Sequence, residues 1–357
     1  MIGSSRKYSN KGTGLFNFAR WAAIAWAASQ CMCVANGHAA GGFALPLRNE
    51  RAPVAITRAQ AVPADDVKRT LVRRLDGRGR SVGDLIIEAQ VVFDMVLSNA
   101  KIDNLKKPPR LVIGATCESP TSAHASGDPR DPAIKLDRAL IWYLYRIAQL
   151  DAYIHTRQSD QQLRETAAAR YINHLMQHWL STRGSSRVCD VDDFAKFLGI
   201  PDERRRELEA DKEFNNLAGI GWYNGMLFSL AHEIAHLQLG HAQGDARDWI
   251  VNEIEADNRA EQIVNTFDPS NAVAAGWIRS YITAFFYFRA ADNKRAGRVE
   301  APSTEDVIKW CVHTIDVQER TVLGPNSPIH QPGSPITAEE VRRHLKDGRE
   351  RCKELFN

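Results

Sequence analysis

Apolar residues recur at helical spacing along most of the chain after residue 80, and this pattern predicts a mainly α-helical fold. A first helix is predicted from Ser81, a suitable N-cap, to about residue 100. The last helix opens with a capping box formed by Thr337 and Glu340. The other predicted helices cover residues 134–154, 160–182, 224–242, 249–267, 271–291 and 303–320, with two shorter ones near 190–214.

Strand signals are few. The stretch "KKPPRLVIGA" (106–115) indicates a turn and a short strand, and "CESPTSAHASGDPRDP" (117–132) is typical of a surface loop. "RLVIGA" or the run "AIKL" (133–136) could offer an edge to an extended peptide. The predicted fold class is therefore α+β, mainly α with a small β-sheet. Residues 41–105 are expected to form an N-terminal arm and helix, and residues 106–357 the main domain.

The first forty residues have the pattern of an export signal. A basic lead with Arg6, Lys7, Lys11 and Arg20 precedes the apolar "WAAIAWAASQCMCVA" and the small-residue exit "NGHAAGG". We therefore expect a signal peptide over 1–40, cleaved after Ala39 or Ala40, and a periplasmic or secreted protein. The alternatives are an uncleaved N-terminal membrane anchor and a cytoplasmic protein with an unstructured arm. No integral membrane segment is predicted in the mature chain.

Composition narrows the function further. Apolar residues make up 44% and charged residues 25%, as in an ordinary globular protein. The net charge of +3 falls to −1 when the four basic residues of the signal are removed, which argues against nucleic-acid binding. Four cysteines lie beyond the signal and form no CxxC pair, so they could form disulfides in an oxidising compartment, with the pairing left open.

The stretch "SLAHEIAHLQLGH" (229–241) contains an HExxH motif formed by His232, Glu233 and His236. Residues four apart lie on one face of a helix, so both imidazoles can reach one metal ion, with Glu233 beside them to polarise a water molecule. His241 lies five residues past His236, about 140° around the helix at 100° per residue, so we expect it to face away and cap the helix.

The next helix offers a third ligand. A short connection predicts antiparallel packing, and at about 1.5 Å per residue His236 is then level with Glu253, and His232 with Asp257. Taken alone, "EIEADNRAE" is also typical of a charged solvent face, and Glu255 is expected to be solvated. Beside an HExxH motif, however, the spacing predicts a metal site of His232, His236 and Glu253. Asp257 would accept a proton from the second nitrogen of a ligand histidine.

"HEIAHLQLGH" followed by "EIEADNRA" resembles the Glu-zincin metallopeptidases, whose pattern is HExxH followed by ExxxD on the next helix, and in particular the HtpX/Oma-type, CAAX prenyl-protease and ImmA/IrrE-type families. The resemblance implies a zincin-like domain with one zinc per chain, held by the same three ligands. It also implies Glu233 as the catalytic base and Asp257 as support.

We therefore expect a zinc metallopeptidase that hydrolyses protein or peptide substrates through a metal-activated water, on envelope or extracellular proteins. One alternative is an intracellular regulatory zinc peptidase of the ImmA-like or phage-exclusion kind. The other is a non-catalytic metal-binding protein, against which the presence of Glu233 argues, because binding a metal does not need a base. A second oxyanion donor is not assigned, although Tyr281, Tyr287 and His330 are candidates.

Overall fold

The computed structural model describes residues 81–354, except for short gaps of which the longest are 242–248 and 325–336. The predicted signal and arm over residues 1–80 lie outside the described residues, as do Tyr281's side chain and His330. The described elements are α3 (Val82–Asn99), β1 (Arg110–Ile113), β2 (Ala123–Ser126), β3 (Ala133–Leu136), α4 (Arg138–Thr156), α5 (Gln161–Thr182), α6 (Phe194–Phe197), α7 (Asp202–Ala210), α8 (Lys212–Leu239), α9 (Trp249–Phe267), α10 (Ala272–Arg295), α11 (Thr304–Val322) and α12 (Ala338–Glu354). The fold is mainly α with a small sheet, as predicted.

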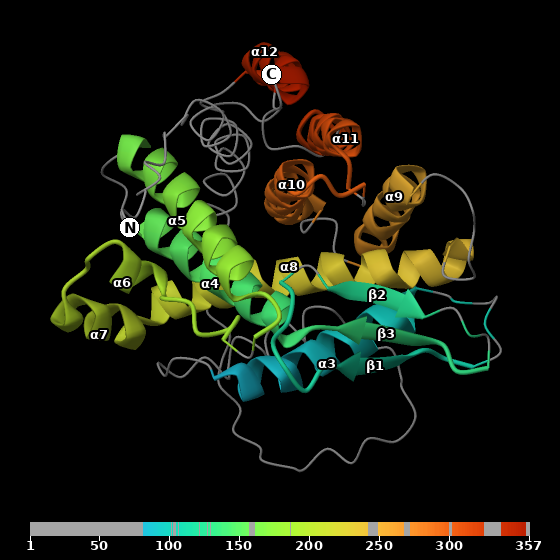
Figure 1. The fold of residues 1–357 in the computed structure, drawn as a ribbon, viewed down its shortest axis with the longest axis horizontal. Helices are drawn as coiled ribbons and strands as arrows, with labels where there is room; N and C mark the ends of the chain where they lie inside the picture. Colours follow the sequence, from blue (N-terminus) through green and yellow to red (C-terminus); the bar gives the residue numbers. More distant parts are fainter. Residues whose placement is uncertain are drawn as a thin grey trace, which may run out of the picture.

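The long helix α8 runs through the centre of the molecule (Figure 1). The sheet and α3 lie along one side of it, α9, α10 and α11 lie along the other, and α4 and α5 cross near its N-terminal half. None of the helices among the described residues combines the length and the hydropathy of a membrane span.

Helix α8 begins at Lys212, twelve residues before the predicted start. Its N-cap is Asp211, whose side chain accepts from the backbone N–H groups of Glu213 and Phe214. The early turns contain glycine and asparagine, which are weak helix formers, so their pattern alone did not indicate a helix. Packing against α4 supplies the stability, because the buried Trp222 donates its indole N–H to the Ile141 carbonyl at 3.1 Å.

The sheet has three strands in the order β1-β3-β2, with β1 parallel and β2 antiparallel to β3. The prediction of a surface loop over 117–132 was wrong at residues 123–126, which form β2. Its sequence "AHAS" has no large apolar side chain and so no strand-like alternation. "AIKL" is β3, which is paired on both sides and therefore offers no edge, whereas β2 is an edge strand that packs on α8.

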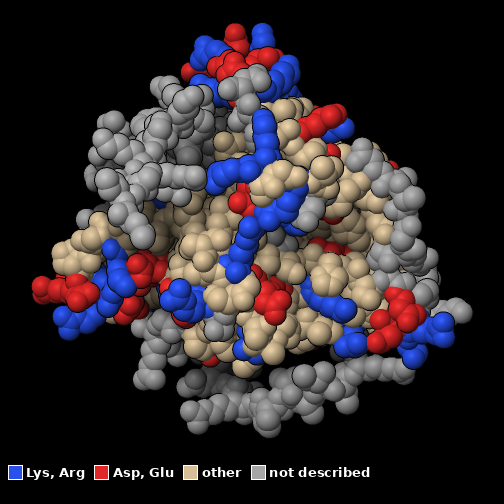
Figure 2. Space-filling view, in the orientation of Figure 1, with Lys and Arg blue, Asp and Glu red and all other residues tan. Residues whose placement is uncertain are grey.

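Predicted caps are present at α3, where Ser81 and Asp84 form a capping box, and at α12, where Thr337 and Glu340 do so. The four cysteines beyond residue 40 form two disulfides, Cys117–Cys189 and Cys311–Cys352. The second joins α11 to α12, the outermost helices of their side of the molecule (Figure 1). On the face drawn in Figure 2, basic and acidic side chains are interspersed among uncharged residues.

Candidate metal centre

The C-terminal half of α8 carries the HExxH motif, and α9 packs against it. Ile234 and Ala235 lie between Glu233 and His236 in the motif and are fully buried. They therefore hold this part of α8 inside the molecule. The histidines and Glu253 then lie where the two helices meet, in the position that the helical spacing predicts.

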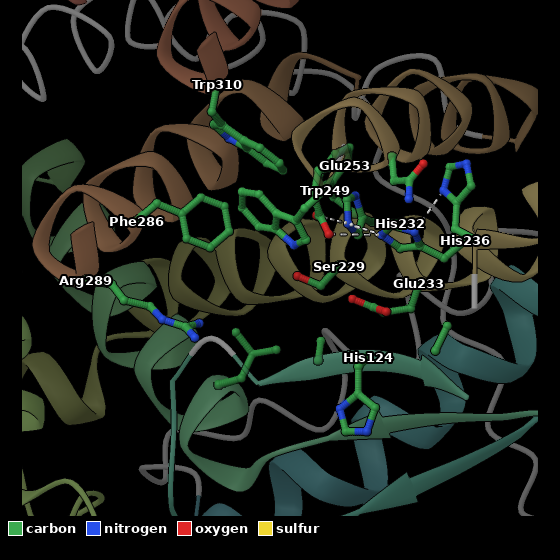
Figure 3. A pocket seen from close by; sticks show the side chains of 16 residues that line it. His124, Ser229, His232, Glu233, His236, Trp249, Glu253, Phe286, Arg289 and Trp310 are labelled. Carbon is green, nitrogen blue, oxygen red and sulfur yellow. Dashed lines mark hydrogen bonds and ion pairs between the residues drawn. The ribbon is translucent and has the colours of Figure 1, made fainter. Parts of the chain in front are cut away.

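Three ligand atoms converge between these helices (Figure 3). His232 Nε2 lies 3.0 Å from His236 Nε2 and 3.1 Å from a carboxylate oxygen of Glu253. His236 Nε2 lies 3.6 Å from the other oxygen of Glu253. All three ligand atoms lie within 4.8 Å of one another, so His232, His236 and Glu253 could hold one metal ion.

Asp257 orients His232 from the outer side. Its carboxylate is fully buried and lies 3.0 Å from His232 Nδ1. The second oxygen lies 3.3 Å from Nε2 of His313, a buried residue of α11. Because an ionised carboxylate only accepts, the hydrogen of His232 belongs on Nδ1, which leaves the lone pair of Nε2 directed at Glu253 and His236.

His241 was predicted to face away, and this prediction was wrong. Helix α8 ends at Leu239 rather than Ala242, because Gly240 takes a left-handed conformation with φ of 76° and turns the chain. His241 therefore folds back, is only 9% exposed, and places its Nδ1 3.1 Å from Nδ1 of His236. Its Nε2 lies 3.0 Å from Glu255, which was expected to be solvated but pairs with His241.

These contacts determine the state of His236. The carboxylate of Glu255 accepts from Nε2 of His241, so a neutral His241 can accept at Nδ1. His236 then donates from its own Nδ1 and keeps a lone pair on Nε2. The lone pairs of His232 and His236 consequently face each other at 3.0 Å. Two acceptors this close, beside a carboxylate, are stable only with a cation or proton between them, and this observation suits a metal site.

Without a metal ion, protons lie between these atoms, and Nε2 of a protonated histidine donates to Glu253 instead of presenting a lone pair. Burial disfavours a charged His232, but the hydrogen bonds to Asp257 and Glu253 prevail and raise its pKa well above the ordinary value. Burial likewise acts to raise the pKa of Glu253, but the hydrogen bonds from His232 and His236 prevail and lower it to about 2. In the metal-free state these shifts favour a charged His232 beside an ionised Glu253.

Glu233 lies beside this centre and faces β2 (Figure 3). Its side chain is buried, and burial raises its pKa above the ordinary value, partly opposed by the nearby histidines. The backbone N–H of Ala125 in β2 also acts, as a smaller effect, to lower this pKa. The sequence did not reveal this contact, because β2 itself was not predicted.

One cavity of about 340 Å³ opens onto these groups. Its polar floor is formed by the motif residues and by β2, while Trp249, Phe286 and Trp310 form an aromatic wall, and Arg289 lies at one end. Tyr287, considered as an oxyanion donor, does not line this cavity; it is buried, and its ring packs edge-on against Phe288.

A model of the family described as Peptidase U49 matches residues 139–324. The match runs from α4 to α11 and includes both helices of the candidate metal centre. No curated protein and no solved structure matches the chain.

Proposed function

The chain belongs to the Peptidase U49 family, and from this premise we propose that it is a zinc-dependent peptidase with Glu233 as its general base. The observation that carries the proposal is the convergence of His232 Nε2, His236 Nε2 and a Glu253 oxygen within 4.8 Å of one another. Two imidazoles and one carboxylate are the protein ligands of many catalytic zinc sites, which leave a further position open. The Glu-zincin likeness of the motif is part of the same proposal.

Zinc, when bound, supplies Lewis-acid activation of water and of the substrate carbonyl. Glu233 takes the proton of the attacking water and returns it to the nitrogen of the scissile bond. The leaving group is then a neutral amine rather than an anion. Its raised pKa brings it nearer to the neutral range, where a carboxylate accepts and releases protons well.

Strand β2 is suited to receive the substrate. It pairs with β3 on one side only, and Ala123, His124 and Ala125 line the cavity. An extended peptide can pair with such an edge through its main chain, which would hold the scissile bond beside Glu233. We therefore propose β2 as the substrate edge, in preference to "RLVIGA" or "AIKL".

We also propose that the protein is exported. All four cysteines beyond residue 40 are paired in disulfides, which persist in oxidising compartments. An intracellular regulatory peptidase would be expected to keep its thiols reduced. Sequencing the N-terminus of the native protein tests this: a start near Ala40 supports export, and an intact Met1 argues for an anchored or cytoplasmic protein.

The zinc site is tested by measuring the metal content of purified full-length protein after dialysis against zinc. About one zinc per chain is expected, with most of it lost in Glu253→Ala. Glu261→Ala is the matched control, because Glu261 is also on α9 but pairs with Arg320. Folded wild-type protein that retains no zinc would refute the site.

Catalysis is tested separately by incubating the zinc-loaded protein with a mixture of denatured proteins and identifying new termini by mass spectrometry. Glu233→Gln should keep its zinc and lose cleavage by about a hundredfold or more, because the base is removed and the ligands are not. Cleavage that survives in Glu233→Gln would refute the role of Glu233, and zinc binding without any cleavage would favour a non-catalytic metal-binding protein.

A further inference from the structure

The cavity has a basic end that the proposed chemistry does not use. Arg289 projects from α10 into the cavity and lies beyond Phe286 and Ser229, on the side away from His236 (Figure 3). Because it is separated from Glu233 in this way, its guanidinium is not placed to act on the reacting carbonyl. It is placed to contact a part of the substrate that extends away from the scissile bond.

Arg289 is half-buried, yet it has no hydrogen-bond or ion-pair partner among the residues that the structure describes. Three other arginines among the described residues have a carboxylate partner: Arg183 and Arg298 both contact Asp292, and Arg349 contacts Asp316. A guanidinium that loses part of its water without gaining a partner is unfavourable, so an anion that enters the cavity would be bound favourably.

The surroundings of Arg289 favour a carboxylate on a peptide. The guanidinium is planar and can form two parallel hydrogen bonds to a carboxylate. Beside it, Phe286 packs on Trp249 and Trp310, with ring centroids 5.4 and 5.0 Å apart respectively. These rings form an apolar wall, which can cover the aliphatic part of a residue whose charged end reaches Arg289.

We propose that Arg289 forms a carboxylate-binding subsite of the cavity, which selects substrates with an acidic side chain or a free C-terminus at one position. The inference rests on the proposed function, because it takes a peptide as the molecule that lies in the cavity. It adds the class of substrate, which neither the motif nor the family describes.

The test uses binding without turnover. Zinc-loaded Glu233→Gln protein is mixed with three sets of short acetylated peptides of randomised sequence. One set has an internal Glu and an amidated C-terminus, one has Gln in its place and a free C-terminus, and the third has Gln and an amide. Retained peptides are separated by size exclusion and counted by mass spectrometry. The same peptides are given to the zinc-loaded wild type to measure cleavage.

One or both carboxylate sets should be retained about tenfold or more over the neutral set, since hydrogen bonds between charged groups are strong. Adding Arg289→Gln to the Glu233→Gln protein should abolish the preference for carboxylates and leave retention of the neutral set unchanged. Arg289→Lys in its place should restore part of the preference. Arg295→Gln is the matched control, because Arg295 is exposed on the same helix and carries the same charge.

The internal-Glu and free-C-terminus sets identify which carboxylate is selected. Equal retention of all three sets, retention of none, or a preference that survives Arg289→Gln would overturn the inference. Cleavage by the wild type without a carboxylate preference would overturn it while leaving the peptidase proposal standing. Selection of carboxylates without any cleavage would support the subsite and count against the peptidase proposal.

Discussion

Replacing His241 with leucine tests whether the contact on the outer side of His236 supports metal binding. His241 Nδ1 lies 3.1 Å from His236 Nδ1, and His241 Nε2 lies 3.0 Å from Glu255. Leucine fills a similar volume but cannot accept a hydrogen bond, so the His236 ring loses the partner that sets its tautomer and orientation. Glu255 is 42% exposed at its side chain and can turn to water, so the change leaves no buried unpaired charge.

The expected effect is on zinc affinity more than on folding. Loss of an outer partner of a metal-ligating histidine weakens metal binding by roughly 10–100-fold, which is about 1.4–2.7 kcal/mol. Glu255→Gln should have a smaller effect, because the amide oxygen still accepts from His241. Affinity is measured by competition with a zinc-binding dye, with the melting temperature recorded beside it.

His178→Leu is the control, since His178 also bonds through a ring nitrogen, but to the backbone carbonyl of Arg187 and away from the centre. An unchanged zinc affinity in His241→Leu, with the fold intact, would refute the reasoning that orients His236. An equal loss in His178→Leu would show that the effect is not specific to this contact.

Three further predictions concern stability. Replacing Cys311 and Cys352 with serine removes a disulfide that spans 41 residues. In the chain-entropy model this should lower the free energy of unfolding by about 4 kcal/mol. An unchanged midpoint of unfolding in guanidinium chloride would contradict the prediction. Gly221→Val should lower the free energy of unfolding by about 1–3 kcal/mol, because a Cβ at this position lies 3.2 Å from the Cβ of Ala148. Unfolding in denaturant measures the change, and an unchanged stability would mean that α4 and α8 separate easily. Burial lowers the pKa of His174 below the ordinary 6.5, so the unfolded chain takes up the proton first and stability should fall as the pH drops below that value. Unfolding at about pH 7.5 and about pH 5.5 should show a smaller difference in His174→Gln, and an equal difference would exclude this residue as a cause.

The sequence by itself was sufficient for features that depend on local geometry. Helical periodicity predicted most helices, and the capping residues Ser81 and Thr337 marked two of their starts. The same periodicity placed Glu253 and Asp257 level with the two histidines of the motif, because rise and rotation per residue are nearly constant in any helix. A short connection between two helices then leaves few ways for them to pack.

Tertiary structure decided what depends on contacts between distant segments. Strand β2 is held by pairing with β3 and by packing on α8, so its small side chains carry no signal of their own. His241 reaches His236 only because Gly240 ends α8 with a left-handed turn. Arg289 joins the cavity through the packing of α10 on α8, and the cysteine pairs follow from which helices and loops meet. Such contacts are set by the free energy of the whole core, which no local pattern encodes.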